Sequence, residues 1–104
     1  MKHKIFDKYL ADILKVFRIE EKDFFSSTKN RSIVDAKQLL YYMCSKRQMR
    51  VSAIREMMVL AGQKHGFNIH MANIQKGVKR AQALVDSDDD YFKVMKRIED
   101  STFI

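Results

Sequence analysis

The chain has 104 residues, of which 46% are apolar and 32% charged, and its formal net charge is +7. This length provides one domain with a single core and excludes two. One cysteine, Cys44, excludes an internal disulfide and favours a reducing compartment. The amino-terminal run MKHKIFDKYLADIL mixes charged and apolar residues, so we expect neither a signal peptide nor a membrane anchor, and we expect the protein in the cytoplasm.

The composition favours helices along the whole chain. It contains no proline, and its three glycines lie between Gly62 and Gly77, so nothing interrupts a helix over the first sixty residues. We therefore predict an all-α fold of about six helices, with residues 1–104 forming a single domain.

The first two helices are predicted from apolar spacing and from acidic residues at a helix start. Residues 5–17 carry apolar side chains at helical spacing and predict a first helix that packs on the core. The run RIEEKDFFSS at residues 18–27 predicts a short second helix, because Glu20, Glu21 and Asp23 favour a helix start and two phenylalanines follow.

A third helix is predicted over residues 32–45. Its inner face is predicted to hold Ile33, Ala36, Leu39, Leu40 and Met43. We expect Lys37, and Tyr41 or Tyr42, elsewhere on this cylinder. Cys44 lies in the apolar run LLYYMC, which predicts a core residue and not a nucleophile. The run KRQMR at residues 46–50 is a basic connector.

Residues 50–85 predict the element around which the chain is organised, two helices joined by a glycine-containing turn. The first helix would start at Ser52, a good N-cap, and end at Gly62, and the second would start near His70. In the second helix Gln75, Lys76, Lys79 and Arg80 are predicted to face outward. A helix with a polar first turn and a basic outer face is typical of the DNA-reading element of a helix-turn-helix motif, although it also suits a small helical bundle with a solvated face.

The positive charge is concentrated on the part of the chain that contains this helix pair. Residues 28–80 hold eleven basic and two acidic residues, a balance of +9, whereas the two flanks together hold nine basic and eleven acidic residues, a balance of −2. Such clustering is the electrostatic footprint of a protein that binds polyanions, and nucleic acid is the partner it favours. A solvated basic face on a small protein is the alternative.

The run DSDDD at residues 86–90 allows two interpretations. Closely spaced carboxylates bind magnesium or calcium, but the glycine and distant glutamate of a calcium loop are missing. Acidic residues ahead of a helix also serve as caps, here for a last helix at residues 91–100 that closes the core. The terminal STFI is expected to fray or to tuck in.

The sequence offers no catalytic or cofactor-binding motif. It has no phosphate-binding loop of the GxxxxGK[ST] type, and one cysteine is too few for a zinc finger. His65 and His70 are five residues apart across a predicted turn, which favours a turn residue and a surface residue over a metal site. We therefore expect neither an enzyme nor a bound metal or cofactor.

The order of motifs from residue 14 to residue 83 resembles the carboxy-terminal DNA-binding domain of the bacterial replication initiator DnaA. That domain carries a pattern like F-x-I-x-x-x-D-L, a basic R-x-R-x-I stretch and a helix beginning A-R-x-Q. The matching residues are Phe17, Ile19, Asp23, Phe24, Lys29, Arg31, Ile33, Asp35, Ala36, Lys37 and Gln38. Residues 51–58 are similar to the family's L-x-x-I-G-x-x-F helix, and IQKGVKRA is similar to its V-x-H-A-V-R-K-I.

The resemblance implies roles for particular residues. Lys37 stands where the family has an arginine that enters the minor groove, and the connector that holds Lys46, Arg47 and Arg50 resembles one that grips phosphates. The family's D-H-T-T signature falls on HMAN at residues 70–73, or on IHMA at residues 69–72 if His70 is aligned with the family histidine. Neither register reproduces the signature, and the turn carries extra residues.

The resemblance implies a DNA-binding domain without the family's nucleotide-binding domain. We expect a freestanding replication factor or regulator of the kind that phages and mobile elements encode, acting in the host cytoplasm at the nucleoid, with double-stranded DNA and replication or transcription proteins as partners. Its monomeric or dimeric state stays open.

The leading hypothesis is a sequence-specific double-stranded DNA-binding protein. His70, Met71, Asn73 and Gln75 would face the major groove and Lys37 the minor groove. The residues predicted to contact phosphates are Lys29, Arg31, Lys46, Arg47, Arg50, Lys76 and Lys79. Two alternatives stay open: a protein-interaction module of the same fold with non-specific DNA affinity, and a dimeric repressor of the Trp-repressor type.

Overall fold

The structure, a computed structural model, describes residues 2–101. Within that range the chain forms α-helices and one 3-10 turn, and no strand. In chain order these elements are α1 (Lys2–Phe17), α2 (Glu21–Phe24), α3 (Arg31–Lys46), α4 (Val51–Ala61), η1 (Gln63–His65), α5 (Met71–Ser87) and α6 (Asp89–Asp100). The prediction of an all-α fold with about six helices is confirmed.

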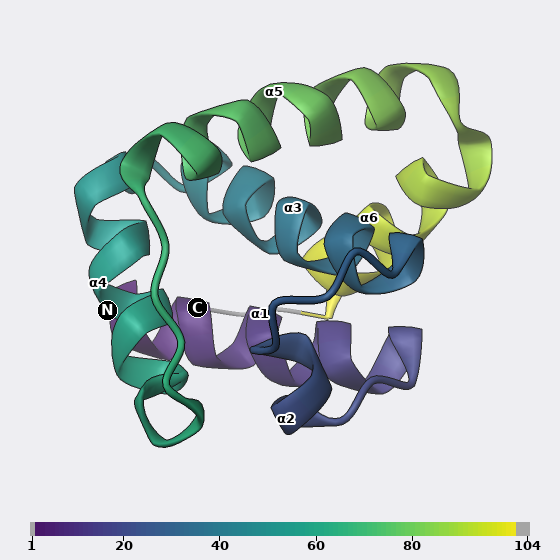
Figure 1. Cartoon of the computed structure of the whole chain (residues 1–104). Coiled ribbons are helices and arrows are strands. Elements are labelled where there is room, and N and C mark those ends of the chain that lie inside the picture. The colour runs from purple at the N-terminus through teal and green to yellow at the C-terminus, as the bar shows by residue number, and fades with distance from the viewer. Residues whose placement is uncertain (1, 102–104) are drawn as a thin grey trace.

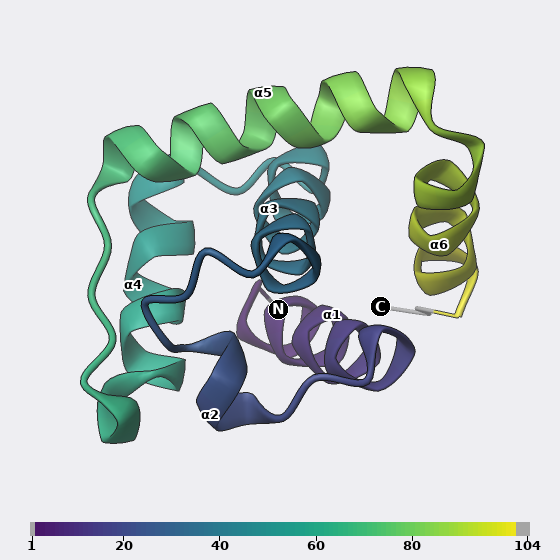
Figure 2. The ribbon, with the colours of Figure 1, turned by 45° about the vertical axis from the view of Figure 1, so that its right-hand side comes forward.

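Helix α3 lies at the centre of the molecule, with α5 on one side and α1 on the other (Figures 1 and 2). Every residue from Leu39 to Cys44 is buried, so this part of α3 is enclosed all round. The prediction that Cys44 belongs to the core is confirmed. Tyr41 and Tyr42, which were expected elsewhere on this cylinder, are both buried too, because helices pack on α3 from several sides.

Helix α6 closes the core with Tyr91, Met95 and Ile98, which are buried at a spacing of three and four residues. It begins at Asp89, two residues before the predicted start. The Asp88 side chain accepts a hydrogen bond from the Tyr91 amide at 3.1 Å, as expected of a capping residue. Among residues 2–101, no group of three His, Cys, Asp or Glu side chains is placed to hold a metal ion.

The start of α4 differs from the prediction. The N-cap is Arg50 and not Ser52, which lies exposed in the first helical turn. The chain leaves α3 through Gln48, whose φ of 67° is left-handed, and becomes extended at Arg50 with ψ of 152°. Because of this tight passage, the first residue of α4 is Val51, and the N-cap lies two residues before the predicted one.

The connection between α4 and α5 spans residues 62–70 and is not a tight turn. After η1 the chain passes through Gly66, which has a left-handed φ of 69°, and runs back along α4. Arg55 of α4 donates a hydrogen bond from Nε to the Ile69 carbonyl at 2.8 Å and fastens the returning segment. As a result α5 begins beside the start of α4 (Figures 1 and 2).

Two further expectations concern the ends of the chain and the membrane. Of the terminal STFI run, Ser101 follows α6 as its C-cap, and residues 102–104 lie outside the described range. Over the part of the chain that the structure describes, no helix is long and apolar enough to cross a membrane.

Candidate nucleic-acid interface

Helix α5 lies on the outside of the molecule and presents one long face to solvent (Figure 2). Its buried residues are Ile74, Gly77 and Ala81. We call the opposite side the α5 outer face. It consists of the exposed residues His70, Met71, Ala72, Asn73, Gln75, Lys76, Lys79 and Arg80. The predicted outward orientation of Gln75, Lys76, Lys79 and Arg80 is confirmed.

A glycine sets how closely α5 approaches α3. A Cβ atom built on Gly77 would lie 2.9 Å from Cδ2 of Tyr41 and 3.2 Å from Cγ of Gln38. A Cβ contact under 3.0 Å is essentially never seen and one of 3.2 Å is unusually tight, so the helices cross closely where one of them has no side chain. This crossing fixes the position and direction of the α5 outer face.

Three basic side chains form a stripe along the α5 outer face. Lys76, Lys79 and Arg80 are separated by three and four residues, which puts them on one side of the helix. None of the three has an acidic partner among the described residues. Arg80 was not among the predicted phosphate contacts, although its spacing of four residues from Lys76 indicates the same surface.

Arg50 adds to this surface at the point where α4 and α5 begin side by side. It is exposed and forms the N-cap of α4. Neither helix start has a side-chain cap or an acidic residue in its first turn. The first amide groups of both helices therefore remain open to an outside acceptor, and both positive dipole ends lie next to Arg50. Helix starts of this kind favour bound phosphate.

The other two connector residues are engaged within the protein. Lys46 forms an ion pair with Glu99 of α6 at 3.0 Å, and its ammonium lies 5.6 Å from the centre of the Tyr42 ring. The hydrogen bond to Glu99 raises the pKa of Lys46. Arg47 donates a hydrogen bond from Nη1 to the Tyr9 hydroxyl at 3.4 Å. Lys46 and Arg47 would have to exchange these partners for a phosphate.

Lys37 does not project into solvent as a groove-entering side chain would. Its ammonium donates a hydrogen bond to the Ser26 carbonyl at 2.9 Å and lies 5.7 Å from the centre of the Phe67 ring. Burial lowers the pKa of Lys37. The role of Lys37 in the minor groove is therefore not supported, because the side chain braces the segment after α2 against α3.

Lys29 and Arg31 lie at the opposite end of α3 from Lys46, Arg47 and Arg50. Lys29 is exposed, and Arg31 pairs with Asp35 at 3.4 Å. Asp35 is half-buried, and this burial raises the pKa of its carboxyl group, while Arg31 opposes the shift. The predicted phosphate contacts therefore fall into two groups, of which the group around Arg50 adjoins the start of α5.

The residues predicted to read bases lie at the start of the α5 outer face. His70, Asn73 and Gln75 are exposed and carry hydrogen-bonding groups. Met71 is 47% exposed and is one of the large exposed apolar side chains. Such a set combines polar groups for base edges with an apolar group for a thymine methyl.

Comparison of the chain with known protein families, with curated proteins and with solved structures found no match.

Proposed function

We propose that this protein binds double-stranded DNA by laying the α5 outer face in the major groove. The observation that carries the proposal is the stripe of Lys76, Lys79 and Arg80, three exposed cations without acidic partners on an external helix. Arg50 and the two open helix starts extend this surface. DNA phosphates suit such groups, because they offer negative charge and several acceptor oxygens.

In this proposal, different residues contact the DNA backbone and the base edges. Lys76, Lys79, Arg80 and Arg50 hold the backbone and give affinity for any duplex. His70, Met71, Asn73 and Gln75 face base edges and give sequence preference. The resemblance of the motif order to the carboxy-terminal domain of DnaA supports a role as a replication-initiator-like protein or a transcriptional regulator.

Selection of bound duplexes from a random-sequence pool tests the proposal. The enriched duplex and a scrambled duplex are then titrated at two salt concentrations. We expect an enriched motif, bound on the order of a thousandfold more tightly than scrambled DNA. The variant Lys76→Ala/Lys79→Ala/Arg80→Ala should bind both duplexes more weakly and with a flatter salt dependence. A control away from the α5 outer face is Lys4→Ala, which removes one charge at an exposed lysine near the start of α1.

A protein-interaction module is the second candidate function, and Met71 favours it. An exposed methionine in the first turn of an external helix suits a protein contact as well as a DNA groove. In that case DNA binding would be weak, salt-sensitive and independent of sequence, and the pool would give no enriched motif. A protein partner recovered by the wild type and lost by Met71→Ala would then identify the function.

A further inference from the structure

A second basic surface lies in a cleft lined by residues of α1 and α6 and by residues just after each of them. Helix α1 lies on the side of α3 away from α5 (Figure 2). The cleft has a volume of about 540 Å³. We call it the α1–α6 cleft, and it is lined by Lys8, Asp12, Lys15, Val16, Arg18, Arg97, Ile98 and Ser101. The proposed DNA contact does not use it.

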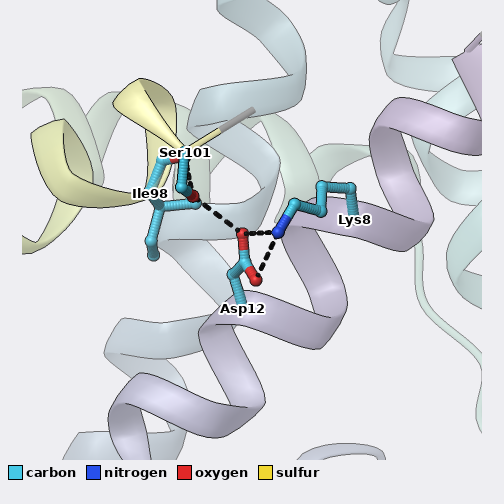
Figure 3. A network of polar contacts seen from close by, with 4 residues as sticks. All are labelled: Lys8, Asp12, Ile98 and Ser101. Carbon is cyan, nitrogen blue, oxygen red and sulfur yellow. Dashed lines mark hydrogen bonds and ion pairs between the residues drawn. The ribbon is translucent and has the colours of Figure 1, made fainter. Parts of the chain in front are cut away.

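One carboxylate in this cleft, that of Asp12, is already bound by groups of the cleft walls. Asp12 pairs with Lys8 at 3.0 Å, and its Oδ2 accepts a hydrogen bond from the Ser101 hydroxyl at 3.2 Å (Figure 3). The cations Lys15, Arg18 and Arg97 line the same cleft, are exposed and have no acidic partner in the described range. Counting residues 2–101, the cleft therefore keeps three positive charges without an acidic partner beside the pair of Asp12 and Lys8.

Helix dipoles explain part of this arrangement. Lys15 lies in the last turn of α1 and Arg97 in the last turn of α6, where basic residues are favoured. Arg18 follows α1 with a left-handed φ of 55°. The dipole effect accounts for each residue singly, but it does not require all three to line one concave surface.

The same chain carries a complementary acidic projection. We call residues 86–90 the acidic corner, and they form the junction of α5 and α6 at the outer edge of the molecule (Figures 1 and 2). All five residues are exposed, and Asp89 and Asp90 have no basic partner within residues 2–101. The corner lies at the start of α6 and the cleft at its end, so the corner of one molecule does not reach the cleft of the same molecule.

We propose that the acidic corner of one copy docks into the α1–α6 cleft of a second copy. Aspartates 86, 89 and 90 would pair with Lys15, Arg18 and Arg97, and the guanidinium groups match carboxylates in geometry as well as in charge. The two contacting surfaces are different, so the contact is head-to-tail and leaves a free corner and a free cleft at the ends. Copies would therefore join in short open chains.

An acidic protein segment suits the cleft better than a second stretch of DNA. Asp12 lies within the cleft, and its charge would repel phosphates along a continuous backbone, whereas a short acidic corner needs contact with the three unpaired cations alone. The net charge of +7 opposes association between copies at long range. Salt of about 0.1 M, with a Debye length of about 10 Å, screens this repulsion more than it weakens close pairs.

Sedimentation velocity without DNA tests the contact in salt of about 0.1 M and about 0.5 M. We expect the wild type to associate reversibly at the lower salt and to dissociate at the higher salt. Lys15→Glu/Arg97→Glu, which reverses the cleft, and Asp89→Lys/Asp90→Lys, which reverses the corner, should each weaken self-association by about tenfold or more. The control Lys4→Glu changes an exposed lysine of α1 that does not line the cleft, and it should associate as the wild type does.

Sedimentation of a mixture of the two reversed variants is the decisive measurement. One keeps an intact corner and the other an intact cleft, and the reversed corner and reversed cleft are complementary in charge as well, so the mixture should associate although neither variant does so alone. Near-wild-type circular dichroism of each variant would confirm that it is folded.

A wild type that stays monomeric at high concentration would overturn the proposal, and so would association that both reversals leave unchanged. Since the sedimentation experiment contains no DNA, its result is independent of the proposed DNA-binding function. If a separate duplex titration shows that the cleft variants lose DNA affinity while their self-association is unaffected, the cleft binds DNA instead.

Discussion

Gly77 lies so close to Tyr41 that a Cβ atom at position 77 would be 2.9 Å from Cδ2 of the tyrosine ring. Tyr41 is 2% exposed and packed in the core, so its ring has little room to move. This contact lets the backbone of α5 rest directly on α3. The direction of the α5 outer face therefore depends on a residue that is itself buried.

Gly77→Ala should destabilise the protein by on the order of 1 kcal/mol. Alanine gains about 1 kcal/mol of helix propensity, but an overpacked contact costs about 1 to 3 kcal/mol. Urea unfolding followed by circular dichroism measures the difference. Ala83→Gly, at an exposed position of the same helix, measures the propensity effect alone. A Gly77→Ala variant that is more stable than the wild type would show that the crossing has room for a methyl group.

The pair of Lys46 and Glu99 predicts a pH dependence of stability. The pKa of Lys46 is raised by the hydrogen bond to Glu99, so the folded state holds this proton more tightly than the unfolded state does. The pair's contribution is complete below the unfolded pKa of 10.5 and is lost as the pH rises through the raised folded value. Because Lys46 is 40% exposed, we expect less than about 1 kcal/mol from the pair.

Urea unfolding of the wild type and of Glu99→Gln measures this contribution. The stability difference between them should be present near neutral pH and should shrink at pH values above the pKa of Lys46. A difference that persists unchanged in strong alkali would mean that Glu99 stabilises the fold by packing.

The same substitution should also release Lys46 for DNA. We expect Glu99→Gln to bind duplexes more tightly than Asp7→Asn, which removes an equal charge from an exposed position of α1. The additional gain should be small, about threefold to tenfold, because one phosphate contact is added. Fluorescence anisotropy with a labelled duplex gives both affinities. Equal gains for the two variants would leave Lys46 out of the interface.

Lys37→Met should lower stability without altering the salt dependence of DNA binding. The ammonium group satisfies the Ser26 carbonyl at 2.9 Å, and methionine leaves that partly buried oxygen without its donor. Loss of such a bond costs about 1 to 3 kcal/mol, and relief of the buried charge offsets part of it. Paired urea unfolding and salt titrations separate the two effects. A flatter salt dependence would restore Lys37 as a DNA contact.

Arg50→Ala and Asn73→Ala should affect DNA binding differently. Arg50 is assigned to phosphates, so its loss should weaken binding to every duplex by a similar factor and flatten the salt dependence. Asn73 is assigned to a base edge, so its loss should reduce the preference for the selected duplex, with a cost of about 1 to 3 kcal/mol at that position. Equal effects of both changes on both duplexes would refute this division of roles.

Cys44 provides a probe of unfolding. Its thiol is fully buried, and burial raises its pKa to about 12. We expect an aromatic disulfide reagent to react with it very slowly at neutral pH, and to react at the usual rate of a free thiol in urea, because the thiolate is the reacting form. Rapid labelling of the native protein would indicate frequent opening of the core around α3.

The sequence by itself determined the helical class, most helix positions and the outward direction of the basic residues on α5. These features depend on residues three and four positions apart. The chain has no proline and only three glycines, so few residues disfavour a helix. The burial of Cys44 followed from its apolar neighbours for the same reason. Local spacing did not reveal that Tyr41 and Tyr42 are both buried, since enclosure of α3 depends on how many helices pack on it.

The tertiary structure alone decided which basic side chains remain available to bind a ligand. Lys46 and Glu99 are 53 positions apart, and Lys37 reaches a carbonyl 11 positions away. The return of residues 66–70 along α4, which brings two helix starts to Arg50, depends on the bond from Arg55 to Ile69. The α1–α6 cleft joins opposite ends of the chain. Such contacts are fixed by helix crossings, and a crossing depends on side chains from both helices at once, which no local pattern contains.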